Sequence, residues 1–269
     1  MGFTPFDFNE AIVQRRDHAL EGLRFGSPVI GLSMRPGVLL VTVRRSQRKI
    51  YEIYDRLMYS AIGNQSDIEA VRLGAVDLAA REGFERSPDD VTAQRLVGFS
   101  LSPALKEVFR DQWRAPSVIR AVFAEMGRTR EEDVFFVLNY DGEFSQHTGM
   151  VALAGTPDAE AAMRDELTAR LGTEGNGAED TLALDSAIAR ALRAWAVGVS
   201  ALSDRERDDD DEEKTAAERV GAKLREELAS ARVEAGLLDR SSPRECKFVM
   251  INASVLERAV ALALDSPSE

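Results

Sequence analysis

Apolar residues near the start of the chain fall into short runs separated by turn residues, which is typical of paired β-strands. Two runs flank a Pro-Gly turn, and a basic loop separates them from a second pair of runs. In order, the runs and their connections are 29–32, the turn 35–37, 38–41, the basic loop 44–48, 49–53 and 59–63. The pattern predicts two strand pairs in succession. Asn64 to Asp67 then supply residues that favour a helix start.

Several longer segments place apolar residues at helical spacing. The helices predicted in this way are 9–24, 66–83, 87–113, 158–171, 178–196, 213–229 and 254–264. Pro103 is expected to kink or split the third of them, because proline lacks the N–H that a helix interior needs. Further strands are predicted at 118–126, 134–140, 150–154, 233–238 and 247–251, with Asp141-Gly142 as the turn before the strand at 150–154.

The order of these elements is strands, helices, strands, helices, strands and a closing helix. Two antiparallel sheets packed face to face, with helices on both outer faces, would satisfy this order. We therefore predict an α+β fold, a four-layer αββα sandwich. A single domain is expected over 9–264, with a segment 1–8 ahead of it, an acidic and helical insertion at 204–231 and a short tail at 265–269.

Composition narrows the classes of function. The 269 residues carry a formal net charge of −12, which argues against a nucleic acid or an anionic membrane as partner, because both reward clustered Lys and Arg. The single cysteine, Cys246, excludes an intrachain disulfide. His18 and His147 lie far apart with no acidic or thiol partner at ligand spacing, so a zinc site or a histidine-based catalytic triad is not expected. With no phosphate loop or set of metal ligands in the sequence, no cofactor is expected. With no run of about 18 apolar residues, a soluble cytoplasmic protein is expected.

The first strand unit also carries a family resemblance. An apolar strand pair, a basic loop, a Lys-Ile-x-x-Ile strand at 49–53 and a small-residue stretch at 59–63 before a helix resemble the opening core of a proteasome subunit. The resemblance covers about residues 6–200 and 232–262. It implies the four-layer αββα sandwich of the N-terminal-nucleophile hydrolases. Residues 9–24 sit where alpha-type subunits keep an extra helix, so the chain resembles actinobacterial 20S proteasome alpha subunits.

The resemblance bears on catalysis. Catalytic subunits of this family use a terminal threonine together with an acidic residue and a lysine. The matching positions here are Ser27, Val43 and Lys49, so only the lysine is retained. We therefore expect no catalytic residue and a non-catalytic subunit of a threonine-type peptidase complex. Two alternatives remain. The chain could be a hydrolase whose nucleophile, Ser27, is released by cleavage after Gly26, or a ring scaffold without beta partners.

As an alpha subunit, the chain would form a homo-heptameric ring that stacks on beta subunits and admits unfolded protein substrates. The resemblance places Lys49 in a pocket between neighbouring subunits, where it pairs with the C-terminal carboxylate of an AAA+ ATPase activator. Arg44, Arg45 and Arg48 are expected to line the same groove. The alternative is that Lys49 is an ordinary surface lysine in a basic loop.

Two further segments have candidate roles. Phe3, Phe6 and Phe8 are the candidate gate, because seven copies near a ring axis could pack together and close a pore; otherwise residues 1–8 are a disordered tail. The insertion 204–231 begins with an acidic run and continues into a helix with a narrow apolar stripe, Val220, Leu224 and Leu228. That stripe either packs on its own domain or receives a partner.

Overall fold

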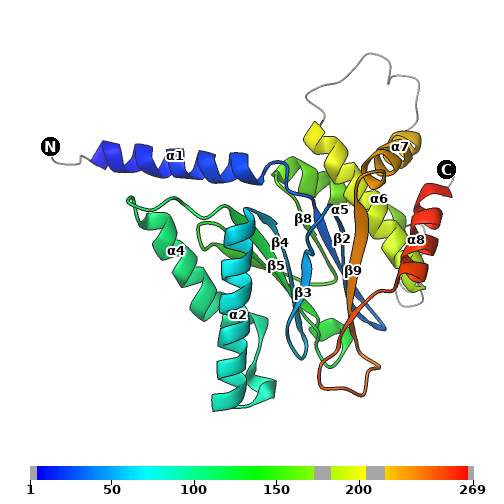
Figure 1. Ribbon diagram of the computed structural model, residues 1–269, viewed down its shortest axis with the longest axis horizontal. Helices are drawn as coiled ribbons and strands as arrows, with labels where there is room; N and C mark the ends of the chain where they lie inside the picture. The colour runs from blue at the N-terminus through cyan, green and yellow to red at the C-terminus, as the bar shows by residue number, and fades with distance from the viewer. Residues whose placement is uncertain (1–4, 173–182, 204–215, 266–269) are drawn as a thin grey trace.

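The computed structural model describes residues 5–172, 183–203 and 216–265. Two five-stranded antiparallel sheets stack face to face, with helices on their outer sides (Figure 1). One sheet has the strand order β10-β9-β2-β1-β8 and the other β3-β4-β5-β6-β7. The strands are β1 Val29–Met34, β2 Gly37–Arg44, β3 Ile50–Tyr54, β4 Leu57–Gly63, β5 Ile119–Glu125, β6 Val134–Asn139, β7 Phe144–His147, β8 Met150–Leu153, β9 Arg232–Asp239 and β10 Phe248–Met250.

Helices cover both sheets, and α1 runs along one end of the sandwich (Figure 1). The helices are α1 Pro5–Leu23, α2 Gln65–Glu85, α3 Ala93–Leu96, α4 Ser102–Arg110, α5 Pro157–Gly172, α6 Leu184–Ser203, α7 Ala216–Leu228 and α8 Ala253–Asp265. Three apolar clusters match the layers. One lies between the sheets, one joins the first sheet to α5, α6 and α8, and one joins the second sheet to α2, α3 and α4. The predicted four-layer α+β sandwich is confirmed.

The strand pairs predicted from the opening pattern are present. β1 pairs with β2 around the turn at Arg35-Pro36, and β3 pairs with β4. The two pairs do not share a sheet, because the loop 45–49 carries the chain from one sheet to the other. That crossing brings the start of β3 beside the first sheet, which matters for the groove described below.

One strand assignment was wrong. The turn at Asp141-Gly142 leads to β7, which pairs with β6, and not directly to the strand at 150–154. The latter strand, β8, pairs with β1 in the other sheet. Gly149, with a φ of +75°, sits in the connection between β7 and β8. The residues of β7 are exposed or partly buried and show no apolar alternation, so the pattern gave no sign of it.

Helix boundaries also differ from the prediction. The segment expected as one helix over 87–113 contains a 3₁₀ turn at Pro88–Asp90, then α3, a π turn at Val97–Leu101 and α4. Pro103 lies in the first turn of α4, where a missing N–H is tolerated. At the N-terminus, α1 begins at Pro5, so the helix predicted over 9–24 starts earlier and includes residues 5–8. At the other end, α8 extends to Asp265.

Candidate functional site

A groove of about 520 Å³ opens at one end of the sandwich. Its walls come from the connection between α1 and β1, the loop between β2 and β3, the end of β4, and the ends of α6 and α7. The connection between α1 and β1 passes close to β4 at Gly26. Only a glycine fits there, because a Cβ would lie 2.8 Å from the Cβ of Ile62. The lining includes Ser27, Val43, Arg44, Arg45, Arg48, Lys49, Ile62, Trp195, Val199 and Glu227.

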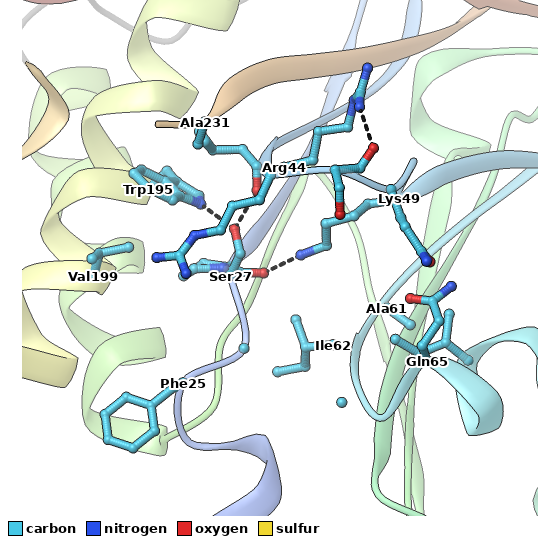
Figure 2. Close-up of a pocket in the computed structure, with 18 of the residues that line it drawn as sticks. Phe25, Ser27, Arg44, Lys49, Ala61, Ile62, Gln65, Trp195, Val199 and Ala231 are labelled. Atoms are coloured by element: carbon cyan, nitrogen blue, oxygen red, sulfur yellow. Dashed lines mark hydrogen bonds between the residues drawn. The ribbon is translucent and has the colours of Figure 1, made fainter. Parts of the chain in front are cut away.

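Lys49 is the central cation of this groove (Figure 2). Its Nζ donates a hydrogen bond to the backbone oxygen of Ser27 at 2.5 Å. Burial lowers the pKa of Lys49 to about 7, and the negative charge of Glu234 opposes that shift. Burial thus withdraws the ammonium from water, and among the described residues it bonds this backbone oxygen, so an entering anion would gain a strong interaction with it.

The hydroxyl of Ser27 is occupied by other partners. Its Oγ donates to the backbone oxygen of Val43 at 2.6 Å and accepts from Nε1 of Trp195 at 3.2 Å, and Figure 2 shows both bonds. Lys49 contacts the carbonyl of Ser27, whereas activation of a nucleophile needs a base on its hydroxyl. The side chain of Val43 is 2% exposed and offers no acidic group.

The three arginines of the basic loop lie in different surroundings. Nε of Arg44 is 2.6 Å from Oε2 of the buried Glu234, so its charge is paired. Arg48 lies over the ring of Tyr51, with 5.5 Å from its guanidinium carbon to the ring centroid, and donates to the backbone oxygen of Ile50. Arg45 lines the groove and is exposed. The structure thus brings all four basic residues to one groove, with Arg44 and Lys49 partly buried and Arg45 and Arg48 exposed.

Sequence reasoning missed two residues of this site, Glu234 and Trp195. Glu234 is 185 positions from Lys49, yet its carboxylate accepts hydrogen bonds from the backbone N–H of Lys49 and of Ile50. An acidic residue within the apolar run 233–238 was a signal that could have been followed. Trp195 belongs to the apolar face predicted for its helix, and it reaches the groove at the end where Ser27 lies.

The candidate gate residues are partly outside the described chain. Phe3 lies outside the described residues, while Phe6 and Phe8 fall in the first turns of α1. Further along α1, Arg15 donates to the backbone oxygens of Val108 at 2.8 Å, Phe109 at 2.8 Å and Arg114 at 2.6 Å. The helix is therefore fastened to the C-terminal end of α4 and to the loop that follows it.

The helix of the acidic insertion packs on its own domain. Leu224 is fully buried in the cluster shared with α6 and α8, and Val220 and Leu228 pack against that cluster. Residues 204–215, with the whole acidic run, lie outside the described residues. Within the described ranges, no group of three His, Cys, Asp or Glu is placed to hold a metal ion. No helix in the same ranges is long and apolar enough to cross a membrane.

A four-layer sandwich with a helix ahead of β1, and a lysine just before β3 that bonds the backbone oxygen of Ser27, two residues ahead of β1, is the arrangement expected of a proteasome-type subunit. No protein-family model matches the chain. A proteasome subunit alpha of Kineococcus radiotolerans is 30% identical over 263 residues, 96% of this chain and 98% of that protein. One of Streptomyces avermitilis is 28% identical over 97% of this chain and 91% of its own length.

A third relative, the proteasome subunit alpha of Streptosporangium roseum, is 34% identical over 167 residues, which cover 60% of this chain and 64% of that protein. These similarities extend over nearly the whole chain in the first two cases. The chain belongs to the proteasome alpha subunit family, and these three relatives come from actinobacteria.

Proposed function

We propose that this chain is a non-catalytic ring subunit of a 20S proteasome core particle. It assembles as a homo-heptameric ring on beta subunits in the cytoplasm and controls the entry of unfolded protein substrates. The groove around Lys49 receives the C-terminal carboxylate of an AAA+ ATPase activator, and residues 1–8, with Phe3, Phe6 and Phe8, form the gate. The observation that carries the proposal is the partly desolvated ammonium of Lys49 in a groove flanked by arginines.

The chemistry of the groove supports an anionic chain end as ligand. Lys49 and the exposed Arg45 offer positive charge, while Ile62, Trp195 and Val199 offer apolar surface beside it. A terminal carboxylate next to apolar side chains matches both kinds of surface. Among the described residues, Glu227 of α7 is the one acidic residue in the groove lining; Glu234 lies outside the lining and pairs with Arg44.

The non-catalytic role is supported by the bonding of Ser27. Its hydroxyl donates to Val43 and accepts from Trp195, and the lysine that would be its partner in a hydrolase bonds its carbonyl. A nucleophile in this fold needs a free amine or another base at its hydroxyl.

Assembly tests the proposal at the level of the whole particle. We expect native mass spectrometry of the full-length chain, co-expressed with a beta subunit, to show a fourteen-copy alpha and fourteen-copy beta particle that cleaves peptides. The chain alone should keep residues 1–26 and cleave nothing. A chain that is cut between Gly26 and Ser27 and hydrolyses peptides without a beta subunit would contradict the proposal.

Ligand binding tests the groove itself. The probe is a fluorescein-labelled Gly-Gly-Leu-Leu peptide with a free C-terminal carboxylate, compared with its C-terminal amide by fluorescence anisotropy on the assembled protein. We expect the acid to bind more tightly, and Lys49→Ala to weaken it by roughly tenfold or more, because a charge-assisted bond is lost. Lys247→Ala is the matched control, since Lys247 is also partly buried and donates to a backbone oxygen, that of Ser242, away from the groove. Equal binding of acid and amide would contradict the proposed role of Lys49.

A further inference from the structure

Glu234 is a buried carboxylate that the groove's ligand would not touch. On β9 the side chains alternate between two faces. Leu238 belongs to the cluster between the sheets, whereas Val233 and Leu237 belong to the cluster under the helices. Glu234 shares the first face with Leu238, so its carboxylate lies between the two sheets, and the residue is only 2% exposed.

The carboxylate is bonded to both ends of one loop. Oε1 accepts from the N–H of Lys49 at 3.1 Å and from the N–H of Ile50 at 2.8 Å, where β3 begins. Oε2 lies 2.6 Å from Nε of Arg44, the last residue of β2. A buried carboxylate is costly unless it is paired and hydrogen-bonded, and here every partner comes from the β2–β3 loop or its two ends.

Close packing of the two sheets makes this reach possible. Gly236, two residues along the same face of β9, lies so near Ile50 that a Cβ would meet Cγ2 of Ile50 at 2.8 Å. The glycine therefore allows β9 to approach the start of β3. As a result one carboxylate from the first sheet fixes the backbone from which the Lys49 side chain leaves the second sheet.

Glu234 also changes the charge that the groove presents. Pairing with Arg44 neutralises one of the four basic residues that line the groove. The other charged residues that line it, within the described ranges, are Arg45, Arg48, Lys49 and Glu227. The positive charge is thereby shifted from the end of β2 toward Lys49 and the loop.

We propose that Glu234 is a positioning residue of the groove: by bonding the N–H groups of Lys49 and Ile50 and pairing with Arg44, it sets the Lys49 ammonium where a ligand carboxylate can reach it. This inference rests on the proposed function of the groove. It adds a residue that contacts no ligand and that acts on affinity through the lysine.

Two substitutions separate the roles of the carboxylate. Glu234→Gln keeps an oxygen that can accept from both N–H groups but removes the negative charge. Glu234→Ala removes the acceptor and the charge together. Asp133→Asn is the matched control, because Asp133 is a fully buried carboxylate paired with Arg240 and lies outside the groove lining.

The first readout is binding of the same Gly-Gly-Leu-Leu acid and amide to the assembled protein at pH 6. We expect Glu234→Ala to weaken binding of the acid by roughly tenfold or more and to leave the amide unchanged. Glu234→Gln should weaken binding of the acid less than Glu234→Ala does, because it keeps the acceptor and loses the charge, and Asp133→Asn should match the wild type. Wild-type affinity for the acid in Glu234→Ala, or equal losses for acid and amide, would overturn the inference.

The second readout needs no ligand. The ¹³Cε resonance of Lys49, assigned by its loss in Lys49→Arg, reports the pKa of that lysine in a pH titration. Because the Glu234 charge raises this pKa against the effect of burial, we expect it to fall in Glu234→Gln and to stay unchanged in Asp133→Asn. An unchanged pKa in Glu234→Gln would overturn the inference. If the wild type binds acid and amide alike, the proposed function fails, and this titration still decides the role of Glu234.

Discussion

Two buried carboxylates hold opposite ends of the sandwich, and their surroundings differ. Asp133 is fully buried and accepts from Arg240, from Ser33 at 2.7 Å and from the N–H of Gly127 at 2.9 Å. Its arginine, Arg240, also donates to the backbone oxygen of Gly127 at 2.6 Å. Every one of these bonds joins loops and strand ends within the protein. Asp133 therefore acts as an internal clamp.

Glu234 has similar partners, an arginine and backbone N–H groups, but those partners line a groove. Arg44 retains 27% of its side-chain surface, and Lys49 turns its ammonium toward Ser27 at the groove wall. A buried carboxylate paired with an arginine can therefore stabilise the fold, as Asp133 does, or position a charged side chain beside a groove, as we propose for Glu234. The two ends should consequently respond differently to equivalent substitutions.

The largest expected effect is on stability at the Asp133 end. Asp133→Asn leaves Arg240 without its anionic partner, and removing one member of a buried pair costs about 3 kcal/mol of unfolding free energy. Urea unfolding followed by circular dichroism measures it. Glu234→Gln should cost less, because Asp133 bonds Arg240 through both carboxylate oxygens, at 2.9 and 2.7 Å, whereas Glu234 contacts Arg44 through one. A larger loss of unfolding free energy in Glu234→Gln than in Asp133→Asn would contradict the distinction between Asp133 as a stabilising residue and Glu234 as a positioning residue.

A smaller loss of stability is expected from Gly236→Ala. The added methyl would lie 2.8 Å from Cγ2 of Ile50 and 2.9 Å from Cε2 of Phe248, so β9 or β3 must shift, at about 2 kcal/mol. The shift also moves Glu234 relative to Lys49, so binding of the acid peptide should weaken. The control is Gly221→Ala in α7, where a Cβ would meet only Nη1 of Arg225 at 3.7 Å. Unchanged peptide affinity in Gly236→Ala would show that the position of β9 does not affect ligand binding in the groove.

The sequence predicted the elements that local signals specify and missed those that such signals do not reveal. The strand pairs before residue 63, the layers and the final strand pair followed from apolar patterns and turn residues, because these are local signals. Strand β7 was missed since its residues are exposed and lack alternation. The helix expected over 87–113 is interrupted because the cap at Thr92 starts a new helix, and a single apolar period does not reveal it.

For the groove, local sequence showed the basic loop, and the family resemblance singled out Lys49, Ser27 and Val43. The structure brings those three residues together. Glu234 could not be assigned, because its partnership with Lys49 spans 185 positions and depends on how the two sheets stack. The chain showed an acid in an apolar strand, and only the register of β9 beside β2 turns it toward the loop.

A moderate effect is expected from pH. With a pKa of about 7, Lys49 is mostly charged at pH 6 and mostly neutral at pH 8, so the acid peptide should bind roughly tenfold more weakly at pH 8. Stability changes in the opposite sense. Because the folded pKa lies below the value of 10.5 for a free lysine, the unfolded chain binds more protons between these values, and Lys49 destabilises the fold less as the pH rises.

Lys49→Met provides the control for both measurements, since it cannot titrate. Its peptide binding should be weak and independent of pH between 6 and 8. Its advantage in unfolding free energy over the wild type should shrink as the pH rises from 7 toward 10.5. Peptide binding by the wild type that stays constant from pH 6 to pH 8 would show that Lys49 does not carry the interaction.

The smallest effect on peptide binding is expected from Arg45, at the exposed edge of the groove. Arg45 is exposed and forms no hydrogen bond or ion pair with another residue of the described ranges, so it can approach an anion but is well hydrated. Exposed charges of this kind contribute about 0.2–1 kcal/mol, and salt screens them. Arg45→Ala should therefore lower the affinity for the acid peptide by up to about fivefold at low ionic strength, with a smaller loss at high salt.

The matched control for Arg45 is Arg35→Ala, because Arg35 is equally an exposed arginine in a strand connection but lies at the turn between β1 and β2. It should leave binding unchanged at either ionic strength. If Arg45→Ala lost as much affinity as Lys49→Ala, the hydrated rim would carry the interaction. Glu234 would then fix the position of a lysine that matters little to the ligand, and the contrast between the two ends of the sandwich would rest on stability alone.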